Sequence, residues 1–464
     1  MEHKITVKDI ISVTKGTLAS GREEILCEHF CTDSRKVQAN DTYVGIKGEN
    51  VDGNQFYEMA LKQGASCCIL QGVDIPEIIK SQYPSTAIVL VENTVKALQQ
   101  IAAYKRSLYD IPVVAITGSV GKTSTKDIVA SVLSQKFHVL KTQGNFNNEI
   151  GLPLTVLQLK DHDAMVVEMG MNSFGEISLL TNIAKPLVAV ITNVGTAHIG
   201  MLGSRENILK AKLEILEGLQ KDGTVIINND NDLLHEWNEK QNHEYNVITY
   251  GIHEKSTIEA TEISLQEEGS TYIAKVDGSS YPVTIQVGGE HFVYNSLCAI
   301  AVSRIFKIPM EQVLKGILEF ELTKKRMEIK KAKNGAIVIN DCYNANYDSM
   351  KAALDYLGKM PNNQKIAVLG DMLELGEYSK ELHEKVGEAV AENHIDLLIC
   401  VGNEAKNIAK KAEENGMKKE AIFTADSNEK AIAILQEKLQ KDDVVLLKAS
   451  NSMNFTQICE AICK

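Results

Sequence analysis

The sequence lacks any apolar run long enough to cross a membrane as a helix. Its opening stretch, MEHKITVKDIISVTKG, has no apolar core of the kind found in secretory signals. These absences argue against the membrane-spanning and secreted classes that such segments mark. We therefore expect a cytoplasmic protein with no membrane partner.

Cysteine is present, but it shows no pattern of a disulfide framework or of a zinc site. The nine cysteines are an odd number, they are scattered, and Cys67 and Cys68 are adjacent. No cysteine pair lies near a second pair at the spacing that zinc requires. This distribution indicates a reduced compartment, which agrees with the expected cytoplasmic location.

Positive charge is also in short supply. Lysine and arginine total 49 against 61 aspartate and glutamate residues, which gives a formal net charge of −12. Because nucleic-acid backbones are bound by clustered cations, this balance argues against a nucleic-acid partner. A local loop can still bind a nucleotide on an acidic protein. Internal repeats, low-complexity tracts and Pro/Gly-rich linkers are missing too, and 464 residues suffice for two to four domains.

What the sequence does contain is most informative at residues 113–123, VVAITGSVGKT. An apolar, β-branched run ends abruptly at Gly118, and Lys122 and Thr123 follow at the expected start of a helix. A strand, a glycine loop and a helix are the context of a phosphate-binding loop, because glycine lets backbone amides approach a polyphosphate. Lys122 suits the β- and γ-phosphates, and the Thr123 hydroxyl suits Mg²⁺.

The spacing of this loop is unusual. Gly118 and Gly121 enclose two residues, whereas the common phosphate loop has four between its glycines. The alternative is a purely structural glycine turn between a strand and a helix. A lysine followed by a hydroxyl at the helix start is a poor choice for such a turn, so the pattern favours a bound polyphosphate.

Three blocks of the chain differ in character, and we draw their boundaries at residues 1–92, 93–322 and 323–464. The first mixes short strands and helices, and the second repeats apolar strands that indicate a buried parallel sheet. The third alternates strands and helices again, as an open doubly wound domain does. The predicted fold class is α/β with three domains: a small mixed α/β N-terminal domain, a central P-loop ATPase-type domain with a mostly parallel sheet, and a C-terminal Rossmann-like doubly wound domain.

The same patterns predict individual elements. Helical spacing over 93–108 predicts a helix that leads into the phosphate-loop strand, and another helix is expected over 378–393. Alternating polarity between about 245 and 287 predicts an antiparallel insertion. Further strands are expected at 164–168, 187–193, 225–228, 336–340, 366–369, 397–401 and 444–447.

Ligands of open α/β sheets bind beyond the carboxyl ends of the strands, so the polar residues there are candidates. Glu168 follows a buried strand beside the phosphate loop and suits Mg²⁺ or its water, although a helix-capping or surface glutamate is the alternative. His198 lies in a glycine-flanked loop after another strand, as a ligand or as a packing residue. Lys212 follows in an amphipathic helix, where its pattern alone favours a solvated lysine.

The third block places a second polar set after its first predicted strand, in DCYNANYDS. Asp341, Asn344 and Asn346 supply directed hydrogen-bond donors and acceptors, although Asx turns explain them equally well. Asp371 and Lys448 end two further strands. A site built from strand ends in two domains suits a third domain that closes over a nucleotide.

Together these segments resemble the Mur ligases, the ATP-dependent amide-forming enzymes of peptidoglycan synthesis. The short loop TGSVGKTSTK is that family's pattern, and the supporting segments follow the family's order through all three blocks. Within the family, the chain looks most like the ligase that joins D-alanyl-D-alanine to UDP-N-acetylmuramoyl-tripeptide. The segments are TDSRKV at 32–37, KTQGNFNNEIGLPLTVL at 141–157, VEMG at 167–170, NVGTAHIG at 193–200, AKLEIL at 211–216, GGEHFVYNSLCAIA at 288–301, DCYNANYDSM at 341–350 and VLGDMLELGE at 368–377.

The resemblance implies a role for each matching residue around ATP and two Mg²⁺ ions. Thr123 and Glu168 would serve one Mg²⁺, and His198 would serve the second with Lys212 as the family's carbamoylated lysine. A neutral amine that takes up CO₂ becomes an anionic oxygen ligand, which suits Mg²⁺. Lys210 is a near competitor, but the AKxE context favours Lys212. The implied catalytic residues are Lys122, Glu168, His198 and Lys212, and the implied phosphate loop is Gly118, Ser119, Val120, Gly121, Lys122, Thr123 and Ser124.

The remaining implied contacts divide among the three domains, which become a UDP-precursor-binding domain, a central ATP-binding domain and a C-terminal ligase domain. Nucleotide contacts are implied for His291, Asn295, Arg326 and Asp341. Substrate contacts are implied for Ser34 and Arg35 at the UDP end, Asn145, Asn147 and Asn148 along the substrate channel, and Asn344 and Asn346 on the D-alanyl-D-alanine side.

Three positions depart from the family's pattern. Tyr347 stands where proline is usual after the DxYNAN motif, and Asn54 stands where histidine is common. Asn451 stands where an arginine is usual near the last strand. The missing arginine removes a fixed cation and a bidentate donor from that region.

Two other functions stay open. A sister ligase that adds a single amino acid, either the third-residue Mur ligase or folylpolyglutamate synthetase, is disfavoured by segments 341–350 and 368–377 and by the lack of a DNPR motif in the third block. A P-loop switch that hydrolyses a nucleotide to change shape belongs to a different class. The expected partners are small-molecule substrates, and we expect a monomer.

Overall fold

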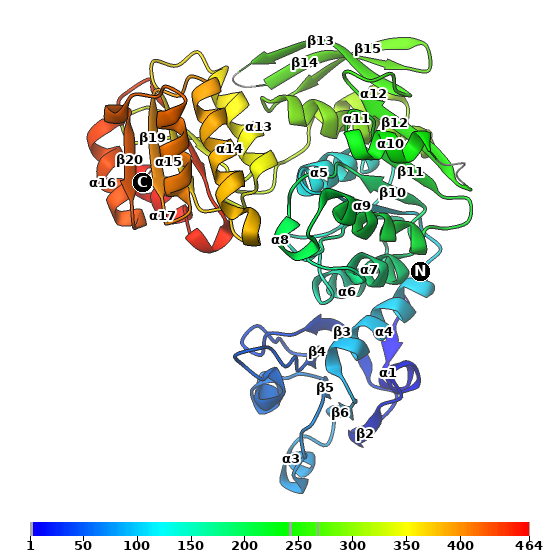
Figure 1. The fold of residues 1–464 in the computed structure, drawn as a ribbon. Coiled ribbons are helices and arrows are strands. Elements are labelled where there is room, and N and C mark those ends of the chain that lie inside the picture. Colours follow the sequence, from blue (N-terminus) through cyan, green and yellow to red (C-terminus); the bar gives the residue numbers. More distant parts are fainter. Residues whose placement is uncertain (1–2, 241–243, 267–268, 464) are drawn as a thin grey trace.

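The computed structural model describes residues 3–240, 244–266 and 269–463, which form three sheets covered by helices (Figure 1). The N-terminal sheet, in blue, and the C-terminal sheet, in yellow to red, each belong to a body that adjoins the green central body. This arrangement confirms the predicted α/β fold. In the described part of the chain, no helix combines the length and the hydropathy that a membrane span requires.

The N-terminal sheet has six strands in the order β1-β3-β4-β5-β6-β2. Strands β3 to β6 run parallel, and the edge strands β1 and β2 run antiparallel to their neighbours. The elements are β1 (Ile5–Thr6), α1 (Val7–Thr14), β2 (Thr17–Ser20), β3 (Leu26–Cys31), β4 (Asp41–Val44), α2 (Tyr57–Lys62), β5 (Cys67–Leu70), α3 (Glu77–Gln82) and β6 (Ala87–Leu90).

Helix α4 (Thr94–Ser107) joins this sheet to the central one, as the helical spacing predicts. The Asn93 side chain accepts a hydrogen bond from Lys96 N and begins the helix, which is the usual role of asparagine at this position. Its buried face includes Leu98 and Ile101, which pack in a core that continues into the central sheet. The first and central bodies therefore share apolar packing.

The central sheet has nine strands in the order β15-β14-β13-β12-β11-β10-β7-β9-β8. All five residues of β7 and of β9 are buried, because helices cover both faces of a parallel sheet. The strands are β7 (Val113–Thr117), β8 (Val139–Lys141), β9 (Ala164–Glu168), β10 (Val188–Ile191), β11 (Thr224–Asn228), β12 (Asn246–Gly251), β13 (Ile258–Gln266), β14 (Gly269–Val276) and β15 (Ser279–Ile285). The helices are α5 (Lys122–Leu133), α6 (Gly151–Val156), α7 (Glu176–Ala184), α8 (Ile199–Leu202), α9 (Arg205–Leu213), α10 (Asp232–Glu239), α11 (Glu290–Ile305) and α12 (Met310–Leu318).

The antiparallel insertion expected between about 245 and 287 needs correction. Strand β12 pairs parallel with β11, so it continues the main sheet. Only the edge is antiparallel, where β13 pairs with β14 and β14 with β15. The alternating pattern is correct for these strands, since one of their faces is buried and the other is exposed.

The C-terminal sheet has six strands in the order β16-β17-β21-β18-β19-β20, parallel except for the edge strand β16. Successive residues of β18 belong to two separate apolar cores: Ala367 and Leu369 to one, and Val368 to the other. Both faces of the sheet are thus covered, as in a doubly wound domain. The elements are β16 (Glu328–Lys331), β17 (Ile337–Asn340), α13 (Tyr347–Gly358), β18 (Lys365–Gly370), η3 (Gly376–Tyr378), α14 (Ser379–Glu392), β19 (Leu397–Val401), α15 (Ala405–Glu414), β20 (Ile422–Ala425), α16 (Asn428–Lys438), β21 (Val444–Lys448) and α17 (Thr456–Cys463).

Candidate active site

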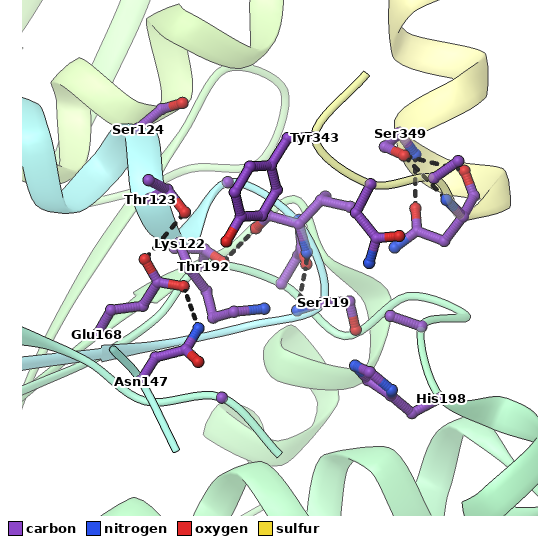
Figure 2. Close-up of a pocket in the computed structure, with 18 of the residues that line it drawn as sticks. Ser119, Lys122, Thr123, Ser124, Asn147, Glu168, Thr192, His198, Tyr343 and Ser349 are labelled. Carbon is purple, nitrogen blue, oxygen red and sulfur yellow. Dashed lines mark hydrogen bonds between the residues drawn. The ribbon is translucent and has the colours of Figure 1, made fainter. Parts of the chain in front are cut away.

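A cavity of about 920 Å³ lies where the central strands end and the C-terminal body begins (Figure 2). Most of the residues singled out in the sequence line it, although they come from both bodies. Gly118, Lys212, Ser34 and Arg35 are not among its lining residues. The predicted residues that do line it are Ser119, Val120, Gly121, Lys122, Thr123, Ser124, Asn145, Asn147, Asn148, Glu168, His198, His291, Asn295, Arg326, Asp341, Asn344 and Asn346.

The phosphate loop occupies the turn between β7 and α5, as predicted. Gly118 has a φ of +151°, and a Cβ at this position would collide with the Thr192 hydroxyl. Gly121 has a φ of +83°, in the left-handed region that favours glycine. Both glycines are therefore required by the backbone, and α5 begins at Lys122 with its amide end toward the cavity.

Lys122 lies inside this loop. Its Nζ donates a hydrogen bond of 2.6 Å to the carbonyl oxygen of Gly118. Burial lowers the pKa of the Lys122 amine, and nearby Glu168 acts in the opposite direction. A cation held at a loop of backbone amides favours an anion such as a phosphate group.

Thr123, Glu168 and Asn147 form a connected polar group beside the loop (Figure 2). Thr123 Oγ1 donates to Glu168 Oε2 at 2.9 Å, and Asn147 Nδ2 donates to Glu168 Oε1 at 2.7 Å. Glu168 is 2% exposed. Oxygen atoms from a hydroxyl and a buried carboxylate are the donors that Mg²⁺ prefers, so the pair fits the predicted metal ligands. Asn147, predicted to line the substrate channel, contacts this carboxylate.

His198 and Lys212 supply a second candidate pair. Burial lowers the pKa of His198 to about 4, and the charges of Lys122 and Lys212 act in the same direction. Burial and the charge of Lys122 lower the pKa of Lys212 well below its ordinary value. Lys212 is 1% exposed, whereas the competing Lys210 is exposed on the same helix. A buried amine that is disfavoured as a cation fits the predicted carbamoylation.

No group of three or more His, Cys, Asp or Glu side chains is placed to hold a metal ion in the part of the chain that the structure describes. The candidate pairs each combine one such side chain with a threonine or a lysine. The His198 Nδ1 atom lies 3.0 Å from Glu374 Oε2, but it is buried and makes no hydrogen bond. This imidazole is thus left with an unsatisfied nitrogen.

The C-terminal body contributes Arg326, which lies just before strand β16. The guanidinium stacks on the Tyr343 ring at 3.9 Å from the ring centre, and its NH2 donates to Thr123 Oγ1 at 3.1 Å. Asp341 is ion-paired with buried Lys448 and accepts a hydrogen bond from Met327 N at 3.1 Å. The Arg326–Thr123 hydrogen bond therefore joins the two bodies, whereas the Asp341 contacts lie within the C-terminal body.

The remaining predicted contacts are partly engaged in structural bonds. Asn295 accepts a hydrogen bond from Thr125 Oγ1 at 3.0 Å, while its buried Nδ2 has no partner. Burial lowers the pKa of His291 to about 4. Asn346 begins α13, where its side chain accepts from Ser349 N at 2.9 Å. The Asn346 side-chain oxygen therefore caps a helix, with a bond that spans three residues and is not an Asx turn.

Several residues of the site were not assigned a role from the sequence. Asn193 Oδ1 accepts hydrogen bonds from Ser119 N and Val120 N, which fixes the phosphate loop. Tyr343 and Asp348 lie in the recognised motif DCYNANYDSM, but the sequence pattern does not indicate which residues they contact. Contacts that join distant segments leave no spacing signal in a single sequence.

Similarity to known proteins identifies the family of this chain. Three domain profiles match it in order: "Mur ligase family, catalytic domain" at 28–106, "Mur ligase middle domain" at 116–303 and "Mur ligase, glutamate ligase domain" at 325–451. The chain belongs to the Mur ligase family.

End-to-end relatives narrow the comparison within that family. The UDP-N-acetylmuramoyl-tripeptide–D-alanyl-D-alanine ligase of Bacillus subtilis is 37% identical, with 98% of this chain and 97% of the relative covered. The crystal structure of MurF from Acinetobacter baumannii has a TM-score of 0.87 at 29% identity and covers 99% of this chain and 98% of its own. MurF of Thermotoga maritima, solved in complex with ADP, has a TM-score of 0.81 at 29% identity and covers 94% and 96%.

Proposed function

We propose that the protein joins D-alanyl-D-alanine to the free carboxylate of UDP-N-acetylmuramoyl-tripeptide, with ATP as the energy source. It works in peptidoglycan precursor synthesis, as a cytoplasmic monomer whose partners are small molecules. One observation carries the proposal: a phosphate loop faces the DCYNAN segment of a second body across one cavity. The end-to-end similarity to D-alanyl-D-alanine ligases supports the choice of substrates.

The reaction has two steps. The tripeptide carboxylate attacks the γ-phosphorus of ATP, so an acyl phosphate forms and ADP leaves. The amine of D-alanyl-D-alanine then attacks the acyl carbon, and inorganic phosphate leaves from the tetrahedral intermediate. Anionic groups meet in the first step, and Lys122 with the loop amides offsets their repulsion as charge develops.

Two Mg²⁺ ions belong to this proposal. Thr123 and Glu168 would hold one, and His198 with carbamoylated Lys212 would hold the other. When bound, the ions neutralise phosphate charge and polarise the phosphorus centre. The hydroxyl and buried carboxylate at one site, and the unsatisfied imidazole and buried amine at the other, support this assignment.

The substrates then lie along a path through all three proposed domains, 1–92, 93–322 and 323–464. His291, Asn295, Arg326 and Asp341 surround the nucleotide in this proposal. Ser34 and Arg35 would bind the UDP end of the precursor, outside the cavity. Asn145, Asn147 and Asn148 would line the channel for its peptide, and Asn344 and Asn346 would face the incoming dipeptide.

One assay tests the function. ADP formation is measured with ATP, Mg²⁺ and UDP-N-acetylmuramoyl-tripeptide while the acceptor is varied among D-alanyl-D-alanine, diaminopimelate, lysine and glutamate. We expect acceleration by the dipeptide alone. Acceleration by a single amino acid would identify a sister ligase, and phosphate release independent of any amine would identify a P-loop switch.

A further inference from the structure

The segment that follows β10, residues 193–198, is termed here the β10 loop. One end holds the phosphate loop: Asn193 Oδ1 accepts hydrogen bonds from Ser119 N at 3.0 Å and from Val120 N at 2.9 Å. Gly195 N donates to Ser119 Oγ at 2.9 Å. The other end is His198. The shape of the β10 loop therefore sets the position of the phosphate loop and of this histidine together.

Asp348 belongs to the C-terminal body and accepts hydrogen bonds from the middle of the β10 loop. It lies in the first turn of α13, and its Oδ2 accepts hydrogen bonds from Thr196 N at 2.7 Å and from Thr196 Oγ1 at 2.8 Å. The carboxylate also packs over Gly195, where a Cβ would collide with it. Position 195 must be glycine for this contact to form.

A role confined to the start of its own helix, α13, does not explain the contacts that Asp348 makes. The helix dipole favours an acidic residue in the first turn of any helix. The start of α13 is already satisfied, because Asn346 and Ser349 form a reciprocal capping box. The helix dipole alone would not require Asp348 to accept two short hydrogen bonds from the central body, and it would not require glycine at position 195. The geometry of Asp348 is that of a contact between bodies.

Neighbouring contacts also join the C-terminal body to the central one. Tyr378 Oη donates to the carbonyl oxygen of Gly203 at 2.6 Å. The backbones at Gly200 and Gly376 approach so closely that a Cβ on Gly200 would collide with the backbone of the other segment. The C-terminal body thus docks along residues 195–203, and Asp348 bonds that stretch at the β10 loop.

We infer that Asp348 is a positioning residue, which makes the shape of the β10 loop depend on docking of the C-terminal body. The inference rests on the proposed function, in which that body also carries the acceptor-side residues Asn344 and Asn346, a few positions before Asp348. Phosphoryl transfer then proceeds efficiently only when the acceptor domain is in place. Activated carboxylate is formed where the amine can reach it, which limits its loss to water.

The test compares full-length variants in the ADP-formation assay with tripeptide and dipeptide. Asp348→Ala is expected to lower kcat roughly 100-fold through misplacement of reacting groups, with Asp348→Asn between this variant and the parent. The KM for ATP and the Kd of ADP are expected to stay within about threefold, because the bonds from Asn193 and Gly195 to the phosphate loop do not involve Asp348 and remain in the variant. Lys351→Ala, which breaks an exposed pair with Asp355 on the same helix, retains the parent kcat.

A second variant separates positioning from folding. Thr196→Val removes one of the two bonds to Asp348 while keeping the size of the side chain, and it too is expected to lower kcat. Combined with Asp348→Ala, it should add little, because both changes remove one interaction. If Asp348→Ala does not fold, Asp348→Asn and Thr196→Val carry the same expectation.

Three results would overturn the inference: a kcat for Asp348→Ala within about twofold of the parent, an ADP affinity that falls as far as kcat, or losses that simply add in the double variant. The proposed function fails separately, if the dipeptide does not accelerate the parent enzyme. The ratio of variant to parent still tests Asp348 in that case, with whichever amine accelerates ADP formation.

Discussion

At the scale of single residues, Lys122 is the side chain on which phosphate chemistry depends most directly. Lys122→Ala is expected to lower the rate of ADP formation by about 100-fold or more, because an oriented charge at the developing phosphoryl anion is lost. Thermal stability should not fall, since burial already disfavours this charge, as the lowered pKa shows. The assay with tripeptide and dipeptide, paired with a thermal melt, checks both. A rate near that of the parent would remove the loop from the mechanism.

Lys212 and Lys210 offer a matched pair on α9, one buried and one exposed. Lys212→Ala is expected to abolish most activity, because the proposed carbamate ligand cannot form. In CO₂-depleted buffer the parent should lose activity and regain it on addition of bicarbonate, whereas Lys210→Ala should behave like the parent. Bicarbonate rescue of the Lys212 variant, or indifference of the parent to CO₂, would contradict the carbamate.

The sequence predicted residues whose chemistry is visible in a local pattern. The phosphate loop followed from glycines between an apolar strand and a helix that begins with Lys122 and Thr123, and Glu168 followed from its place at a strand end. Asn193 and Tyr343 could not be assigned, because their partners are far along the chain and appear only when the bodies meet. Asn346 shows the limit of the pattern, since a candidate ligand side chain caps a helix.

At the scale of elements, buried strands were predicted best. The run at 397–401 agrees with β19 and the run at 164–168 with β9, because continuous apolar residues flanked by helices have few other uses. The strands β8, β16 and β20 were not predicted. Strand β16 has no fully buried residue, β8 has three residues, and β20 lies at a sheet edge, so none has a continuous apolar run.

Helix α14 contains a buried histidine, His383, whose neutral form is fully bonded. Met372 N donates to Nε2 at 2.9 Å, and Nδ1 lies 2.7 Å from the carbonyl oxygen of Ser379. Burial lowers the pKa of His383 from its ordinary value of 6.5. The unfolded chain therefore takes up a proton below pH 6.5 that the folded protein resists, so stability falls as pH drops through that value.

This element predicts a measurable pH dependence. In urea unfolding between pH 7.5 and about 5, His383→Gln should lose part of the decline that the parent shows below pH 6.5. Above pH 6.5 His383 is neutral in both the folded and the unfolded parent. The stability curves of the parent and of His383→Gln should therefore run parallel there. Curves that stay parallel through the acidic range would show that His383 takes up its proton equally in both states.

At the scale of the whole molecule, the family and the activity predicted from the motifs are confirmed by end-to-end relatives. The prediction depended on the order of the motifs along the chain, because each single motif also fits other functions. The sequence predicted a site shared by the central and C-terminal bodies, and residues of both bodies line the cavity. The contacts that join the bodies, such as Thr196 with Asp348, could not be predicted, because they form between distant segments. The domain boundaries at 92 and 322 stay a proposal.

The N-terminal body gives the last prediction, because Ser34 and Arg35 lie outside the cavity and contribute to binding alone in the proposed function. Arg35 is exposed and holds Asp33 with two hydrogen bonds, of 2.8 and 2.9 Å, so its planar donors are already oriented. Arg35→Ala is expected to raise the KM for the UDP precursor roughly 10- to 100-fold through loss of charged hydrogen bonds. At saturating precursor kcat should be unchanged, because the interaction is the same in the ground and transition states.

Lys36 is the matched control, since it is equally exposed and lies 4.0 Å from the same Asp33 carboxylate. Lys36→Ala removes the same formal charge without removing a planar, bidentate donor, so its KM values for precursor and ATP should equal those of the parent. Equal increases in the KM for the precursor in Arg35→Ala and Lys36→Ala would show that general electrostatic attraction explains the effect. A fall in kcat for Arg35→Ala at unchanged KM would instead place this arginine's influence in the chemical step, and the proposed division between a binding body and a reacting cavity would be wrong.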